Sequence, residues 1–293
     1  MFKKITLKVL IFIAVATFGQ QLFVACDMAE PEEKFIGLQL YSVREVMKSE
    51  PAATVAKVGE MGYKFVEAAG YSDGKFYGMA PEKFAELCNE SGTEFLGSHT
   101  GQDVPDSTNW DQTMQWWDDC IAAHKAAGVK WIVQPWMGGV GYESLEGLKR
   151  YCEYFNAVGE KCNEQGIRFG YHNHDKEFTT TFEGKPAYDW MLQLTDPEKV
   201  MFQLDLYWII EGGKDPLNYF NEYPGRFYLW HIKDKEEVGA SGEIDFEQIF
   251  AARDKAGAEY GIVEVEEYNF EPIVSVEKSL EFLNEAEYVD LQE

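Results

Sequence analysis

The sequence predicts an α/β protein that folds as a single (β/α)8 TIM barrel with parallel strands. Eight short apolar segments alternate with eight segments whose apolar residues have helical spacing. This alternation is typical of parallel strands joined by right-handed helical crossovers, and eight units favour a closed barrel over an open sheet. Ionisable residues also gather where the apolar segments end, which is the side of such barrels that carries active sites.

The predicted elements follow one another from residue 34 to residue 293 without a linker rich in Pro, Gly or Ser, so we expect one domain there. Pro51 and Pro81 each open a predicted helix, whereas Gly128 and Gly257 end one. We expect strands at residues 35–41, 64–68, 94–98, 131–135, 167–172, 201–205, 226–231 and 261–265. We expect helices at residues 51–61, 81–89, 111–127, 145–165, 187–194, 216–222, 246–256 and 273–286.

The N-terminal segment is predicted to lie outside the barrel. Residues 1–26 have the basic start and apolar core of a signal peptide, and residues 27–33 read as a polar tether. Phe23-Val-Ala-Cys26 resembles a bacterial lipobox, which implies cleavage before Cys26 and lipidation of its thiol. Plain cleavage near Ala25 and an N-terminal membrane anchor are the alternatives. We therefore expect an exported protein, in the periplasm or attached to a membrane of the bacterial cell envelope only through that lipid.

Composition narrows the classes of partner. The formal net charge of -25 argues against binding to nucleic acids or anionic membranes, which require basic surface. The remaining four cysteines fall in helical patterns without a CxxC spacing, so we expect small buried residues and no zinc site; they are Cys88, Cys120, Cys152 and Cys162.

The ends of the predicted strands carry an unusual set of polar groups. Imidazoles and carboxylates that converge on one face are costly to bury unless something compensates them, and a divalent cation would do so. Mixed ligands of these two types suit Mn, Zn, Co, Fe or Mg without choosing among them. The set comprises Gln39, Tyr41, Glu67, His99, Gln134, His172, His174, Asp205, Trp208, His231, Lys233, Asp234, Glu264 and Glu266.

Five motifs in the chain resemble a known superfamily, the xylose-isomerase-like barrels. More narrowly, the chain is similar to the proteins called sugar phosphate isomerases/epimerases, and the resemblance covers the whole chain after the tether. The motifs are Tyr171-His-Asn-His-Asp175, Leu204-Asp-Leu-Tyr-Trp208, Leu229-Trp-His-Ile-Lys-Asp234, Gly242-Glu-Ile-Asp-Phe246 and Ile262-Val-Glu264.

The resemblance implies four metal ligands, one after each of strands five to eight. Asp205, His231 and Glu264 match the family's Asp, His and Glu, whereas His172 stands where the family has a Glu. This substitution keeps a ligand type but removes one of the two carboxylates that shuttle protons in ketose epimerases. Glu266 lies on the same strand face as Glu264 and is a second candidate for ligand or base.

The other site residues have less specific assignments. Glu264, Glu266, His174 and Lys233 are candidates for proton transfer, and Glu67 and Asp234 could orient ligating histidines. Glu67 and Lys233 could instead pair with each other or with neighbours across the barrel mouth, and Glu177 could belong to a solvated loop. We predict substrate contacts from Glu67, His99, Gln134, Glu177 and Trp208, of which Trp208 could stack on a sugar face.

Our first functional hypothesis is a metal-dependent sugar isomerase or epimerase that abstracts an α-proton and forms an enediolate. The same site could cleave a 3-keto-glycoside by β-elimination, and a non-catalytic sugar-binding lipoprotein is the hypothesis from another class. DNA nicking, which the superfamily also includes, is disfavoured by the acidity and the predicted export. The export and the absence of a basic phosphate clamp in the sequence indicate a non-phosphorylated keto-sugar or keto-glycoside.

Overall fold

A computed structural model describes residues 34–291 of the chain. The predicted signal peptide, Cys26 and the tether lie outside these residues. Between residues 34 and 291, no helix has both the length and the apolar character that crossing a membrane requires.

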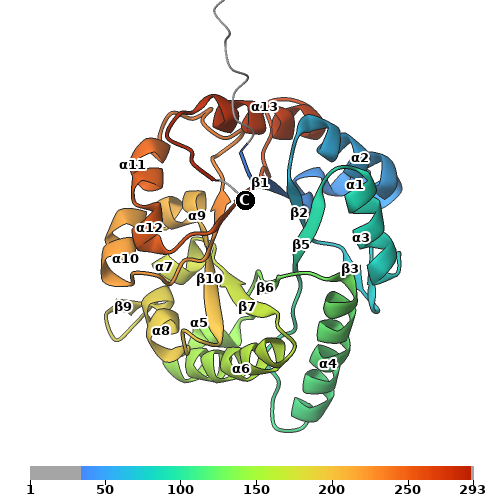
Figure 1. Ribbon diagram of the computed structural model, residues 1–293. Helices are drawn as coiled ribbons and strands as arrows, with labels where there is room; N and C mark the ends of the chain where they lie inside the picture. The colour runs from blue at the N-terminus through green and yellow to red at the C-terminus, as the bar shows by residue number, and fades with distance from the viewer. Residues whose placement is uncertain (1–33, 292–293) are drawn as a thin grey trace, which may run out of the picture. The chain divides into compact units, whose positions relative to one another are not determined.

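Eight parallel strands close into a barrel with helices around it (Figure 1), which confirms the predicted fold class. The ring closes where β1 pairs with β12, with Ile36 opposite Gly261. In order around the ring the strands are β1 (Ile36–Gln39), β12 (Tyr260–Val263), β11 (Leu229–Ile232), β10 (Val200–Asp205), β7 (Arg168–His172), β6 (Trp131–Gln134), β5 (Glu94–His99) and β2 (Phe65–Ala68).

The predicted helices are present, with one correction. The helix expected at residues 246–256 is broken at Ala252 into two short helices. Gly128 and Gly257 end helices as expected, with φ of 76° and 78° in the left-handed region that favours glycine. The helices are α2 (Pro51–Met61), α3 (Pro81–Glu90), α4 (Trp110–Ala127), α6 (Leu145–Glu164), α8 (Ala187–Leu194), α10 (Pro216–Glu222), α11 (Phe246–Ala251), α12 (Arg253–Ala256) and α13 (Pro272–Glu285).

Short elements that the sequence did not predict fill the loops between the main strands and helices. The first strand ends early because the Gln39 side chain accepts a hydrogen bond from the Tyr41 backbone N–H at 3.1 Å and starts a 3-10 turn. The short elements are η1 (Leu40–Val43), α1 (Arg44–Ser49), β3 (Tyr71–Ser72), β4 (Lys75–Phe76), α5 (Val140–Glu143), α7 (Lys176–Thr179), β8 (Thr181–Phe182), β9 (Lys185–Pro186) and α9 (Leu206–Glu211).

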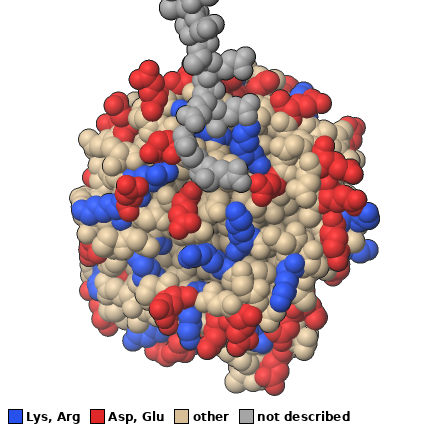
Figure 2. Space-filling model, viewed as in Figure 1, with Lys and Arg blue, Asp and Glu red and all other residues tan. Residues whose placement is uncertain are grey.

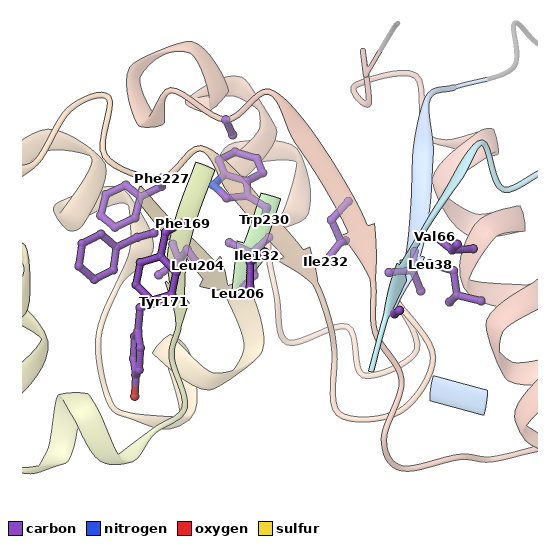
Figure 3. Close-up of a cluster of buried hydrophobic side chains, with 14 of the residues drawn as sticks. Leu38, Val66, Ile132, Phe169, Tyr171, Leu204, Leu206, Phe227, Trp230 and Ile232 are labelled. Carbon is purple, nitrogen blue, oxygen red and sulfur yellow. The ribbon is translucent and has the colours of Figure 1, made fainter. Parts of the chain in front are cut away.

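Alternation along the strands divides the apolar core into two regions. Outward-facing residues such as Phe169, Leu204 and Trp230 are buried between the barrel and its helices (Figure 3). Inward-facing residues fill the barrel interior below the polar strand ends; they are Phe65, Leu96, Trp131, Val133, Met201, Leu229 and Ile262. The barrel interior is therefore packed, and the polar strand ends lie above this apolar layer.

The distribution of charge on the surface and the burial of the cysteines agree with what the composition predicts. On the face shown in Figure 2, Lys and Arg side chains are interspersed with Asp and Glu and do not gather into a basic patch. The four cysteines of the described chain are free and buried, as predicted; they are Cys88, Cys120, Cys152 and Cys162.

One histidine lies in the outer core, between the barrel and its helices, and not in the group at the barrel mouth. His124 of α4 is fully buried, with Nδ1 at 2.7 Å from the Cys120 carbonyl oxygen and Nε2 against the Ser98 hydroxyl. Because a carbonyl only accepts, Nδ1 carries the hydrogen and Nε2 accepts from Ser98. Burial lowers the pKa of His124 to about 4.

We expect His124 to make the protein less stable as the pH falls. Between its unfolded pKa of 6.5 and its folded pKa of about 4, the unfolded chain binds a proton that the folded chain does not. Stability is therefore complete above pH 6.5 and falls toward pH 4, by up to roughly 3 kcal/mol from this group. Urea denaturation at pH 7 and pH 5 would measure the fall, which should be smaller in His124→Gln. An equal fall in both proteins would contradict this assignment.

Candidate metal and proton-transfer site

The site begins where the apolar filling of the barrel ends. Side chains on a strand repeat on one face every second residue, so Ile262 in the interior is followed upward by Glu264 and Glu266. The same alternation places Met201, Gln203 and Asp205 on the inner face of β10. Polar side chains from neighbouring strands thus converge directly above the apolar layer.

Four of these side chains form a compact group of metal-ligand type. His172, Asp205, His231 and Glu264 each offer one donor atom, and the four atoms all lie within 4.8 Å of one another. They come from or directly follow β7, β10, β11 and β12, which are consecutive around the barrel. The four residues predicted as ligands are therefore brought together, and all four are buried.

Asp205 provides the test of whether a cation fits this group. Its Oδ1 accepts a hydrogen bond from the Trp208 backbone N–H at 2.7 Å, but its Oδ2 is buried without a partner among the described residues. Burial raises the pKa of Asp205 to about 7, with Lys233 acting in the opposite direction. A buried oxygen that lacks a partner is unfavourable, and a divalent cation held by two imidazoles and two carboxylates would satisfy it.

His231 is oriented by Glu67. Its Nε2 lies 2.9 Å from Glu67 Oε2, and its Nδ1 lies 3.2 Å from Glu264 Oε2. Burial alone would lower the pKa of His231, but Glu264 and Glu67 together raise it to about 10. A ligating imidazole commonly donates its second N–H to a carboxylate, so Glu67 fixes the ring and leaves Nδ1 for a cation.

Gln203 links the other imidazoles to the same carboxylate. Its Oε1 lies 3.1 Å from His172 Nδ1 and 2.6 Å from His99 Nε2, while its Nε2 lies 3.0 Å from Glu67 Oε1. The sequence interpretation missed Gln203, although its place two residues before Asp205 on the same strand face was a usable signal. His172 thereby directs Nε2 toward Asp205 Oδ2, 4.0 Å away.

Lys233 lies between Glu264 and Glu266, the two carboxylates that follow β12. Its Nζ lies 3.2 Å from Glu264 Oε2, also contacts Glu266, and lies 5.2 Å from the centre of the Trp208 ring. Although burial acts against it, the carboxylates hold the pKa of Lys233 above its usual value. Lys233 therefore pairs with its neighbours Glu264 and Glu266 at the barrel mouth, as one alternative predicted, and not with Glu67.

A cavity of about 290 Å³ opens above the donor group. Its polar lining comprises His99, His172, His174, Glu264 and Glu266. The cavity thus gives a small molecule access to two of the four donors and to three further ionisable groups. Trp208 does not line it but lies beside His174, with ring centres 5.7 Å apart.

Besides Trp208, three predicted substrate contacts need correction, because their side chains have other partners. Glu67 is completely buried beneath the histidines. Val133 points into the barrel, so the next residue, Gln134, points outward. Its Nε2 donates to the backbone oxygens of Gln102 and Trp136 at 3.0 Å each. Glu177 is likewise buried and neither reaches the cavity nor lies in a solvated loop.

Asp234 also has a different role from the one predicted. It accepts hydrogen bonds from the backbone N–H groups of Lys235, Gly239 and Ser241. These contacts stabilise the loop after β11, so Asp234 does not orient a histidine.

Glu177 anchors the loop that carries His174. Its Oε2 accepts from the His174 backbone N–H at 2.9 Å, and its Oε1 accepts from the hydroxyls of Tyr142 and Tyr171. We expect Glu177→Ala to lower the free energy of unfolding by about 3 kcal/mol, because three donors would lose a buried charged acceptor. Urea denaturation would measure this, with the exposed Glu183→Ala as control. Equal stability of the two variants would contradict the anchoring role.

Comparisons with known proteins agree with the fold. The family model described as "Xylose isomerase-like TIM barrel" matches residues 55–286. A solved sugar phosphate isomerase/epimerase from Parabacteroides distasonis is 31% identical, with a TM-score of 0.81 over 87% of this chain and 99% of its own. The IOLI protein, solved with a bound zinc atom, is 14% identical with a TM-score of 0.65 and shares the fold alone.

Curated relatives match over shorter stretches. An inosose dehydratase of Lacticaseibacillus casei is 31% identical over 100 residues, which are 34% of this chain and 33% of the relative. An inosose dehydratase of Clostridium perfringens is 30% identical over 146 residues, 42% of this chain and 48% of the relative. The chain thus spans between a third and a half of these relatives' lengths. Because the family model covers most of the chain, the chain belongs to the xylose isomerase-like TIM barrel family.

Proposed function

We propose that this protein is a divalent-metal-dependent sugar lyase, which removes the proton α to a carbonyl and expels the β-substituent of a non-phosphorylated keto-sugar, keto-glycoside or keto-polyol ring. The observation that carries the proposal is the asymmetry of the cavity. Glu264 and Glu266 lie on the β12 side, whereas the β5 and β7 side offers only imidazoles.

This asymmetry suits elimination. Elimination requires one group that takes a proton and another that gives one, so a carboxylate facing an imidazole is a suitable pair. Epimerisation between two carboxylates would need a second acidic residue on the β7 side, where this chain has His172 and His174. The names of the curated relatives, dehydratases of inosose, also favour a lyase.

The chain's own residues have distinct roles in this proposal. Glu264 is buried among His231 and Lys233 and serves as a cation ligand, whereas Glu266 reaches the cavity and takes the α-proton. His174 gives a proton to the departing oxygen, so that a hydroxyl leaves as water while a carbon–carbon double bond forms. A cation held by His172, Asp205, His231 and Glu264 would polarise the carbonyl of the substrate.

Two features support a non-phosphorylated substrate. No Lys or Arg is among the residues that line the cavity within the described chain, and carboxylates dominate its β12 side. A phosphate group would meet repulsion there without a compensating cation side chain. The export predicted from residues 1–26 supports the same choice, because phosphorylated sugars are mainly cytoplasmic.

Isomerisation or epimerisation is the second candidate. The similar proteins from Parabacteroides distasonis carry that name, and His174 could return a proton to the substrate face opposite Glu266. Both reactions begin with the same proton abstraction, and they differ in whether the resulting anion expels a β-substituent or takes back a proton.

The test combines metal analysis with a reaction in D2O. We expect near-stoichiometric Mn, Co, Fe or Zn in the purified protein, and less than about a tenth of that amount in Asp205→Ala and His231→Ala. The surface variant Asp118→Ala should keep its metal. With inosose as the first probe, elimination would release one water molecule, which mass spectrometry detects. Deuterium uptake without loss of water would instead favour isomerisation.

A result without metal would reject the proposal. If the protein holds none even after reconstitution, proton abstraction beside a polarised carbonyl loses its basis. Bound metal and bound sugar without turnover or deuterium exchange would favour the non-catalytic sugar-binding protein.

A further inference from the structure

Two exposed aromatic side chains border the same cavity. Tyr41 and Trp136 both line it, and each is 41% exposed. Single exposed aromatic residues are common on proteins and need no explanation. Two of them at the opening of one polar cavity are more informative, because ligand pockets pair aromatic walls with a few convergent polar groups.

The barrel places these two rings on different sides of the opening. Tyr41 follows β1 and Trp136 follows β6, and these strands are three steps apart in the closed eight-stranded ring. Between them, the end of β2 contributes the small side chain of Ala69 to the lining, and the end of β5 contributes His99. The opening therefore has an aromatic residue on each of two sides.

The Tyr41 ring and the backbone that carries Trp136 both have supports. The guanidinium of Arg44 lies 4.6 Å from the centre of the Tyr41 ring and donates to the Tyr268 hydroxyl at 2.7 Å. Trp136 follows Pro135, which restricts the backbone, and its carbonyl oxygen accepts from Gln134 Nε2 at 3.0 Å. Gln134 thus positions the loop of Trp136. Rings held in advance lose little freedom when a ligand binds.

We propose that Tyr41 and Trp136 form a second ring-binding subsite, which holds the second pyranose ring of a two-ring substrate. A pyranose presents C–H groups on its faces and hydroxyls at its edge, so its faces pack on aromatic rings while its hydroxyls stay in water. The reacting ring occupies the polar floor beside Glu266 and His174. This inference deepens the proposed function and rests on it, because it takes the substrate to be a carbohydrate.

Equilibrium binding tests the subsite without requiring turnover. Isothermal titration calorimetry would compare methyl β-D-glucopyranoside, which has one ring, with cellobiose and maltose, which have two. We expect at least one disaccharide to bind about 10-fold more tightly than the single-ring probe, as one favourable stacking contact provides. The advantage should disappear in Trp136→Ala and Tyr41→Ala and persist in Tyr41→Phe.

The matched control is Trp110→Ala. Trp110 of α4 is 37% exposed but does not line the cavity, so its removal should leave the advantage of the disaccharide unchanged. Thermal unfolding would confirm that the variants fold, as expected for exposed positions. Equal binding of one and two rings, or an advantage that survives both alanine variants, would overturn the subsite. Tighter binding of phenyl β-D-glucopyranoside than of both disaccharides would overturn the pyranose as its occupant.

The same design separates this inference from the proposed reaction. If the protein binds disaccharides through Tyr41 and Trp136 but neither eliminates nor exchanges an α-proton, the subsite stands and the reaction fails. If it turns over single-ring substrates but binds two-ring sugars no more tightly than one-ring sugars, the reaction stands and the subsite fails.

Discussion

Glu266→Gln is expected to lower kcat by about 10²- to 10⁴-fold, the usual contribution of a positioned general base, while the bound metal remains. Glutamine has nearly the same shape but cannot accept the α-proton. Glu266 reaches the cavity with 27% of its side chain exposed and contacts Lys233 without belonging to the four-donor group. Exchange of the α-proton in D2O and metal analysis of the same preparation would measure the two effects.

Two neighbouring glutamates provide controls for this prediction. Glu264→Gln should lose both metal and activity, because Glu264 is one of the four clustered donors. Glu267→Gln should lose neither, since Glu267 is exposed and absent from the cavity lining. If Glu266→Gln retained its kcat, the base would have to be another residue, and Glu264 would be the next one to test.

Glu67→Ala is expected to lower the free energy of unfolding by about 3–5 kcal/mol, the cost of removing one partner from a buried charged network. The Glu67 carboxylate accepts from Gln39 Nε2 at 2.8 Å, Trp131 Nε1 at 2.7 Å and Gln203 Nε2 at 3.0 Å, and lies 2.9 Å from His231 Nε2. Alanine would leave all of these groups buried without their acceptor. Urea denaturation would measure the loss.

A second variant separates this structural effect from the effect on the metal. Glu67→Gln preserves the volume but no longer offers a full carboxylate to His231, so metal affinity should fall by about 10- to 100-fold. Glu94→Ala, at the exposed start of β5, is the control for replacing a strand glutamate. Wild-type stability of Glu67→Ala would show that the carboxylate does not hold the barrel interior together.

The fold was predictable because each main element carries its own signal in the sequence. Apolar strands alternate with helices. Pro51 and Pro81 each begin a helix, and Gly128 and Gly257 each follow the last residue of another helix. The two small hairpins, β3–β4 and β8–β9, were not predictable in this way. Their strands have only two residues each, too few for any periodicity to appear.

The sequence could predict only those site residues whose position follows from where a strand ends and how its side chains alternate. Asp205, His231 and Glu264 follow from their places at strand ends, and Gln203 could have followed from the same alternation. The alternation also shows why Gln134 is not at the cavity, since Val133 before it points inward. The partners of Glu177 could not be predicted, because Tyr142 lies 35 residues away and meets it only in the folded chain.

The order of the strands around the barrel has a consequence for how the protein is made. The four clustered donors belong to β7, β10, β11 and β12, the last four barrel strands that the ribosome produces. Until β12 emerges, β1 has an unpaired edge, and the nascent chain has an open sheet that could pair with other chains. A cation at the proposed site would therefore bind only after nearly the whole chain is made, and it could not guide the first half of the chain to its fold.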